Sequence, residues 1–216
     1  MEKNNLSKAI HLKNLCTSNN HFQMLALDQR PPIFNIISQS TKRKPTYGEV
    51  VECKKLICSN LSHLSSAALM DPYYSIPTIL NDNKSKGLII TLEDHDFIET
   101  KKGRYSRNIN NWSVEKIKKI GGDAVKVLAW YRPDAEKKSL DHQKKYIHKI
   151  GNECEKFSIP FLLELLVYPL KNDEHHTTEY KEQKNKKNQH VIDSVKEFAK
   201  DKYKVDIFKL TLHTFK

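Results

Sequence analysis

Short apolar runs of strand length recur along the chain, and they carry the first prediction about its fold. Several of these runs are apolar at nearly every position, which is typical of parallel strands buried on both faces of a sheet. We therefore expect β-strands at the following places: 22–28, 66–71, 87–93, 123–131, 160–168 and 205–210.

Amphipathic segments separate the apolar runs. Strands that alternate with helices form βαβ units around a parallel sheet, so the sequence predicts one α/β domain over residues 1–216. A polar stretch without periodicity, 171–190, is expected to form a solvated loop. From the helical spacing of apolar residues we expect helices over 48–66, over 137–157, and from about Val191 to Ala199.

The chain is basic, with 37 Lys and Arg against 26 Asp and Glu among its 216 residues, a formal net charge of +11. Such a balance suits nucleic acid or anionic, phosphorylated small molecules. The lysines are interleaved with acidic residues, and the aromatic residues lie in apolar runs rather than beside basic ones. Because base stacking needs aromatic residues next to cationic ones, we consider nucleic acid the less favoured partner.

The cellular setting follows from what the sequence does not contain. No segment approaches the run of about 18 apolar residues that a membrane-spanning helix needs. The amino-terminal residues 1–10 show no apolar core of a signal peptide. The four cysteines form no CxxC pair and lie in apolar surroundings, so we expect reduced, buried thiols in a cytoplasmic protein.

Three charged residues interrupt the apolar runs with apolar neighbours on both sides, namely Lys126, Glu164 and Lys209. Side chains alternate between the two faces of a strand, so Lys126 shares a face with Ala124 and Leu128. The carboxyl ends of parallel strands carry the functional groups in barrels and open sheets alike. A buried unpaired charge costs several kcal/mol, so these residues are either paired with one another or functional.

Two interpretations of this trio are open. In the structural one, Lys126 and Glu164 form an ion pair inside the sheet while Lys209 reaches solvent. In the functional one, Lys209 is a nucleophilic amine whose pKa is lowered by burial and by a second cation, Lys126. Glu164 would then transfer protons while a covalent iminium forms and a carbon–carbon bond breaks.

Five stretches resemble a known family, and they occur in the family's order from about residue 21 to residue 210. The chain is similar to class I, Schiff-base aldolases of the tagatose-bisphosphate and sulfofructose-phosphate type, which are (β/α)8 TIM barrels. The matching stretches are MLALDQR, AALMDPYYSIP, NWSVEKIKKIGGDAVKVLAWYRPD, IGNECEKFSIPFLLELLVYPL and VDIFKL.

The resemblance implies a role for each matching residue. Lys209 in VDIFKL falls on the Schiff-base lysine, Lys126 in DAVKVL on a second active-site lysine, and Glu164 in LLELL on the acid/base glutamate. Such enzymes cleave a phosphorylated ketose to dihydroxyacetone phosphate and an aldehyde, and they need neither a metal nor another cofactor. Substrate contacts are implied for the residues that end the first apolar run, namely Asp28, Gln29 and the adjacent Arg30.

The chain also departs from this family. Thr211 and His213 stand where the family usually carries a glutamate and a proline. The family has two further strands, whose loops hold its phosphate, and no glycine follows Gly151 here to build such a loop. We therefore expect an incomplete barrel of about six βα units, truncated at the carboxyl end relative to the family. A non-catalytic remnant, a homo-oligomer, or a subunit completed by another chain are the alternatives to an active enzyme.

Signals for a metal site are weaker. The acidic run 93–96 at a strand end is expected to be a solvated loop rather than a divalent-cation site. Only His95 and His213 fall near strand ends, too few for a zinc-dependent aldolase. Three further histidines fall in the polar stretch without fixed geometry, namely His175, His176 and His190.

Overall fold

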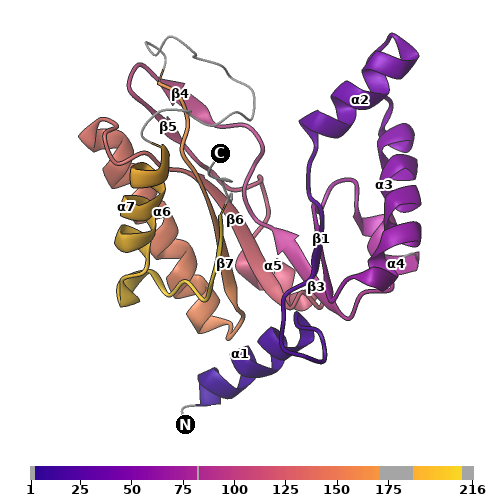
Figure 1. The fold of residues 1–216 in the computed structure, drawn as a ribbon, viewed down its shortest axis with the longest axis horizontal. Helices are drawn as coiled ribbons and strands as arrows, with labels where there is room; N and C mark the ends of the chain where they lie inside the picture. The colour runs from indigo at the N-terminus through magenta and orange to yellow at the C-terminus, as the bar shows by residue number, and fades with distance from the viewer. Residues whose placement is uncertain (1–2, 82, 171–186, 211–216) are drawn as a thin grey trace.

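The computed structural model describes residues 3–81, 83–170 and 187–210. Six parallel strands form one curved sheet in the order β1-β2-β3-β6-β7-β8 (Figure 1). All six expected strands are confirmed, each shorter at its ends than the apolar run that predicted it. They are β1 (Met24–Leu27), β2 (Ala67–Met70), β3 (Gly87–Thr91), β6 (Ala124–Trp130), β7 (Phe161–Leu166) and β8 (Ile207–Lys209).

Helices flank the sheet on its outer face. In Figure 1, α2, α3 and α4 lie on the β1 side, α6 and α7 lie beside β6 and β7, and α1 lies below the amino ends of the strands. The three expected helices are present as α3, α6 and α7. The helices are α1 (Lys3–Asn14), α2 (Pro31–Thr41), α3 (Tyr47–Leu61), α4 (Ile76–Asn81), α5 (Val114–Lys119), α6 (Lys137–Lys156) and α7 (Lys187–Phe198), with 3-10 turns η1 (Ser62–Leu64) and η2 (Asp201–Tyr203).

Two expectations about local structure need correction. The polar stretch 171–190 was expected to be a loop throughout, but α7 already begins at Lys187. The first turn of this helix is polar and precedes its apolar residues, so the pattern of apolar residues did not reveal it. The rest of that stretch lies outside the described residues. The expectation of four buried thiols was also too broad: all four cysteines are free, but only Cys58 and Cys154 are buried, while Cys16 and Cys53 are half-exposed.

The two faces of the sheet have different chemistry. On the outer face, alternate strand residues pack with the helices into the main hydrophobic core. On the inner face, the amino-terminal level is apolar and is covered by Leu15, which follows α1. A second apolar level, with Trp130 and Tyr168, lies at the carboxyl ends of β6 and β7. Between these two levels the inner face carries Lys126 and Glu164, because side chains alternate along each strand.

A hairpin that the sequence pattern did not predict covers the carboxyl ends of β6 and β7. It consists of β4 (Ile98–Thr100) and β5 (Gly103–Tyr105). Its fully buried Arg104 places the guanidinium carbon 4.2, 4.7 and 4.8 Å from the ring centres of Phe97, Trp130 and Tyr168. The backbone N–H of Arg104 donates a hydrogen bond of 3.0 Å to the Tyr168 hydroxyl. Cation–π contacts to three rings thus anchor the loop that follows β3.

No helix among the described residues is long and apolar enough to cross a membrane.

Candidate active site

Lys126 lies at the centre of a cluster of buried charges on the inner face of the sheet. Its ammonium is 2.7 Å from Asp28 Oδ2, 2.6 Å from Glu93 Oε1 and 3.0 Å from Glu164 Oε2. The Lys126 side chain is 1% exposed, and the three carboxylates are 6 to 10% exposed. Three acidic groups, two that directly follow or lie close after β1 and β3 and one within β7, therefore converge on one ammonium that is shielded from water.

Lys209 joins this cluster through Glu164. Its ammonium is 2.8 Å from Glu164 Oε1, and its side chain is 38% exposed. Glu164 and Lys209 are directly opposite each other in the β7–β8 register, which fixes the contact. Glu164 therefore bridges the two lysines, with one carboxyl oxygen towards each. The Lys126–Glu164 pair of the structural interpretation is present, and Lys209 combines this contact with partial access to solvent.

The electrostatic environment shifts the pKa values of the three acids in different directions. Burial opposes ionisation of Asp28, yet Lys126, Lys209 and Arg30 hold its pKa below the ordinary value. Burial also opposes ionisation of Glu164, but Lys126 and Lys209 lower its pKa. For Glu93 the effect of burial, together with the nearby Asp28, outweighs the effect of Lys126, so that the pKa of Glu93 is raised.

The three residues that end the first apolar run occupy different environments. Asp28 is bound to Lys126, whereas Gln29 is exposed. Arg30 is 3% exposed and donates from Nη2 to the backbone carbonyl of Glu93 at 3.2 Å. Its Nε and Nη1 are buried and have no hydrogen-bond partner among the described residues. Of the three, the structure thus brings Asp28 and Arg30 to the charged cluster and leaves Gln29 at its surface.

A second buried ion pair supports the end of β1 from behind. Lys54 on α3 and Asp71 after β2 are both fully buried and in contact. The Lys54 ammonium also donates to the backbone carbonyl of Leu27 at 2.5 Å, one residue before Asp28. Asp71 Oδ1 in turn accepts hydrogen bonds from two backbone N–H groups in the turn before α4. The pair fixes the backbone from which Asp28 extends.

Glu93 and Lys54 are the residues of this region that sequence reasoning missed. Glu93 stood in a run of four adjacent titratable residues at the end of β3, and nothing in the pattern distinguished it from the other three. Lys54 occupied a core-facing position of α3 and was counted in the helical stripe. The signal that was available for both is a charged residue at a position whose neighbours predict burial.

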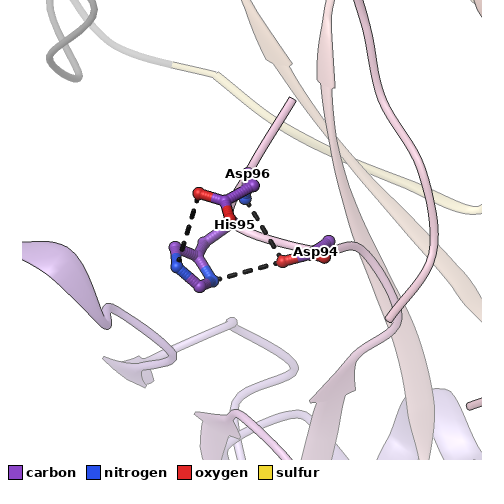
Figure 2. A group of neighbouring side chains, drawn as sticks. All are labelled: Asp94, His95 and Asp96. Carbon is purple, nitrogen blue, oxygen red and sulfur yellow. Dashed lines mark hydrogen bonds and ion pairs between the residues drawn. The ribbon is translucent and has the colours of Figure 1, made fainter. Parts of the chain in front are cut away.

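The rest of the acidic run forms a separate group, drawn in Figure 2. The His95 ring lies 3.2 Å from Asp94 and 3.6 Å from Asp96 (Figure 2). Arg107, which the figure does not draw, contacts Asp94 at 3.2 Å. The atoms of Asp94, His95 and Asp96 that could bind a metal lie within 4.8 Å of one another. Contacts inside the group and with Arg107 account for these side chains, so we assign no metal to them.

Of the other histidines considered for a metal site, His190 alone lies among the described residues. His190 is buried on α7, and its Nε2 lies 3.8 Å from Asp134. His175, His176 and His213 lie outside the described residues.

Comparisons with known proteins agree on one family. The family model described as "DeoC/LacD family aldolase" matches residues 22–213. Tagatose 1,6-diphosphate aldolase 1 of Enterococcus faecalis is 33% identical over 210 residues, which cover 97% of this chain and 63% of that protein. Tagatose 1,6-diphosphate aldolase of Streptococcus pneumoniae is 31% identical over 203 residues, 94% of this chain and 61% of that protein.

Among solved structures, an archaeal fructose 1,6-bisphosphate aldolase superimposes with a TM-score of 0.51 at 14% identity, over 81% of this chain and 60% of that one. At this identity the likeness shows the fold alone, and it confirms an α/β, TIM-barrel-like class with the six-stranded sheet curled as part of a barrel. The chain spans somewhat more than three fifths of the two curated relatives named above. With a family match over nearly its whole length and close to one third identity, the chain belongs to the DeoC/LacD aldolase family.

Proposed function

We propose that this chain carries the site of a class I aldolase, a carbon–carbon lyase that cleaves a phosphorylated ketose through a Schiff base on Lys209. The observation that supports it most directly is Glu164 held between two lysines, 2.8 Å from Lys209 and 3.0 Å from Lys126. An amine that attacks a carbonyl must be able to pass its proton to a neighbouring base, and Glu164 is within hydrogen-bonding distance of Lys209.

The reaction can be written with these residues alone. The neutral Lys209 amine adds to the ketone carbon, and Glu164 returns a proton to the hydroxyl that leaves as water, which gives an iminium. Glu164 then takes the proton of the substrate hydroxyl next to the scissile bond. The bond breaks, its electron pair enters the iminium, and the aldehyde departs. Protonation and hydrolysis of the remaining enamine release dihydroxyacetone phosphate and regenerate Lys209.

Substrate binding is assigned to the end of β1. Asp28 is fixed against Lys126 and can accept a hydrogen bond from a sugar hydroxyl beside it. Arg30 offers a cation whose Nε and Nη1 lack hydrogen-bond partners among the described residues, and Gln29 offers an exposed amide. A phosphorylated sugar suits this set because guanidinium groups bind phosphate well and the chain's net charge is +11. The proposal needs neither a metal nor another cofactor.

The proposal places the protein in the cytoplasm, where sugar phosphates are metabolised and thiols stay reduced. All four cysteines lie in the described part of the chain, and all are free.

The alternative is a non-catalytic homologue, or a subunit whose site is completed in a homo-oligomer or by another chain. One observation favours association: β1 and β8 are the edges of the sheet formed by the described residues. Unpaired strand edges present backbone N–H and C=O groups to other chains. Activity that appears only in a complex would support this alternative over a self-sufficient enzyme.

The test is borohydride trapping with dihydroxyacetone phosphate, read by peptide mass, with circular dichroism on the same sample. We expect a stable adduct on Lys209 and its complete loss in Lys209→Ala. Lys149→Ala is the matched control, because the Lys149 side chain is 76% exposed on α6. An adduct that persists unchanged in Lys209→Ala, or no adduct on folded wild-type protein, would overturn the catalytic assignment.

A further inference from the structure

Among the described residues, Glu93 is the one carboxyl of the cluster with a buried oxygen that lacks a hydrogen-bond partner. Its Oε1 lies 2.6 Å from the Lys126 ammonium, whereas its Oε2 is buried without a hydrogen-bond partner among the described residues. The whole residue is 4% exposed. An ionised carboxylate accepts through both oxygens, and leaving one of them buried and bare is costly. A proton there replaces the cost of a buried charge by the smaller cost of a buried O–H group.

The backbone around Glu93 leaves the side chain little freedom to turn away. Its carbonyl accepts a hydrogen bond of 3.2 Å from Arg30 Nη2, and Glu93 forms an isolated antiparallel bridge with Asn108. The next residue, Asp94, donates its N–H to the Arg107 carbonyl at 2.8 Å. Glu93 is therefore held in place at the inner face, where its contact with Lys126 is maintained.

Counterions are distributed unevenly among the three acids. Glu164 contacts two ammonium groups, those of Lys126 and Lys209. Asp28 contacts Lys126 and is also favoured by the charges of Lys209 and Arg30. Among the described residues Glu93 has Lys126 as its one direct ion pair, and that ammonium already contacts the other two acids. The nearby Arg30 also favours ionisation of Glu93. Of the three acids, Glu93 thus has the weakest stabilisation of its ionised form by nearby cations.

We propose that Glu93 is a positioning residue that acts as a neutral carboxylic acid, holding Lys126 through Oε1 while Asp28 and Glu164 remain ionised. This role rests on the proposed aldolase function of the same site. Opposite protonation states for neighbouring carboxyl groups are a common way to divide acid and base roles. The raised pKa of Glu93 and the lowered pKa values of the other two acids agree with this division.

The neutral state of Glu93 matters for the nucleophile. With Glu93 protonated, the anions Asp28 and Glu164 face the cations Lys126, Lys209 and Arg30, so that the cluster becomes neutral when Lys209 releases its proton. With Glu93 ionised, the same release would leave one net negative charge. An additional buried anion would favour the ammonium form of Lys209 and oppose its attack on a carbonyl.

The groups that face Glu93 come from several elements, and each acts on its proton. Lys126 on β6 and Arg30 after β1 favour ionisation, while Asp28 opposes it. The buried Tyr146 hydroxyl on α6 and the neighbouring Asp94 share this environment, and burial together with Glu93 raises the pKa of Tyr146. Only the burial of Glu93 and the anionic neighbours keep the proton in place.

The protonation state can be tested without any enzymatic activity. The infrared difference spectrum of wild type minus Glu93→Gln at neutral pH should contain the C=O band of a protonated carboxyl group. Glu93→Gln keeps an oxygen that can accept from Lys126, so the variant is expected to fold. A difference spectrum that contains carboxylate bands alone would overturn the proposal, even if the protein shows no aldolase activity.

The role in the reaction is tested by the pH dependence of borohydride trapping with dihydroxyacetone phosphate. The trapping rate of Glu93→Gln relative to wild type should rise as the pH passes the value at which Glu93 ionises. Glu164→Gln, the matched amide control, should be slowed at every pH by about 10²-fold or more. Equal slowing of Glu93→Gln and Glu164→Gln at neutral pH would show that Glu93 works as a carboxylate. An unchanged pH profile in Glu93→Gln would show that its role is only structural.

Discussion

Replacing Lys126 by methionine tests whether one ammonium holds the charged cluster together. Methionine keeps an unbranched side chain of similar length at a position that is 1% exposed, so the perturbation is chiefly the loss of charge. Asp28 loses its direct ion-pair partner, whereas Glu164 keeps Lys209 at 2.8 Å. The variant therefore retains one paired carboxylate and leaves Asp28 buried without a direct ion pair, while a neutral Glu93 loses only the donor to its Oε1.

The magnitude follows from burial. The three contacts of Lys126 measure 2.6, 2.7 and 3.0 Å, and no partner is more than 10% exposed, so solvent screens them little. Removal of one member of a buried ion pair costs about 3–5 kcal/mol, because the remaining charge stays buried. We expect the free energy of unfolding of Lys126→Met at pH 7 to fall by about that amount.

The sign of the pH dependence separates this cost from a packing defect. Without Lys126, the folded-state pKa of Asp28 rises above its unfolded value, so the folded variant binds a proton more tightly than the unfolded chain. Acidification from pH 7 towards pH 5 should then recover part of the lost stability of Lys126→Met relative to wild type. A cavity or a misplaced methyl group would lower the free energy of unfolding by the same amount at both pH values.

The assay is urea unfolding followed by circular dichroism at several pH values between 5 and 7. Lys149→Met is the control: its side chain is 76% exposed, and its pair with Glu153 spans 4.0 Å, so its loss should cost less than about 1 kcal/mol at every pH. If Lys126→Met unfolds like this control, or if its deficit is independent of pH, the account of a cluster held by one ammonium is wrong.

Two further predictions concern single positions. Asp28→Asn should lower stability at neutral pH, because the pKa of Asp28 in the folded state lies below the ordinary value of an aspartate. The contribution of Asp28 to stability is present above its unfolded-state pKa and is lost as the pH falls through its folded-state pKa, so the deficit measured by urea unfolding should disappear in acid. Gly103→Ala should cost about 1–3 kcal/mol in the same assay, since the new Cβ would lie 1.9 Å from Ser139 Oγ. Removing that obstacle with Ser139→Gly should recover most of the loss, and an additive double variant would contradict the explanation.

The strands were predictable because their signal is local. Runs such as 160–168 are apolar at nearly every position, and period-2 alternation alone places Lys126 with Leu128, and Glu164 with Leu166, on one face. The hairpin of β4 and β5 was missed for the opposite reason: its strands are polar and three residues long, and its burial depends on the non-local insertion of Arg104 between three rings.

The site was predictable only in part, because its contacts depend on the curvature of the sheet. Adjacent strands explain the pairs that Glu164 makes with Lys126 and Lys209. Asp28, however, lies three strands from Lys126 in the sheet order and meets it at 2.7 Å only because the sheet curls and brings the end of β1 across the inner face. No one-dimensional pattern contains that curvature, which arises from strand twist and the helices packed behind it.

The curvature also changes the role that Lys126 can have. The functional interpretation of the sequence treats Lys126 as a free second cation beside Lys209. In contact with three carboxyl groups, however, its charge is offset by those that are ionised, and the electrostatic field at Lys209 depends on how many of them are ionised. Glu164, which touches both lysines, transmits this balance directly. The reactivity of Lys209 therefore depends less on the number of nearby lysines than on which of the surrounding acids are protonated. Each of these acids, Asp28, Glu93 and Glu164, can be replaced separately by its amide.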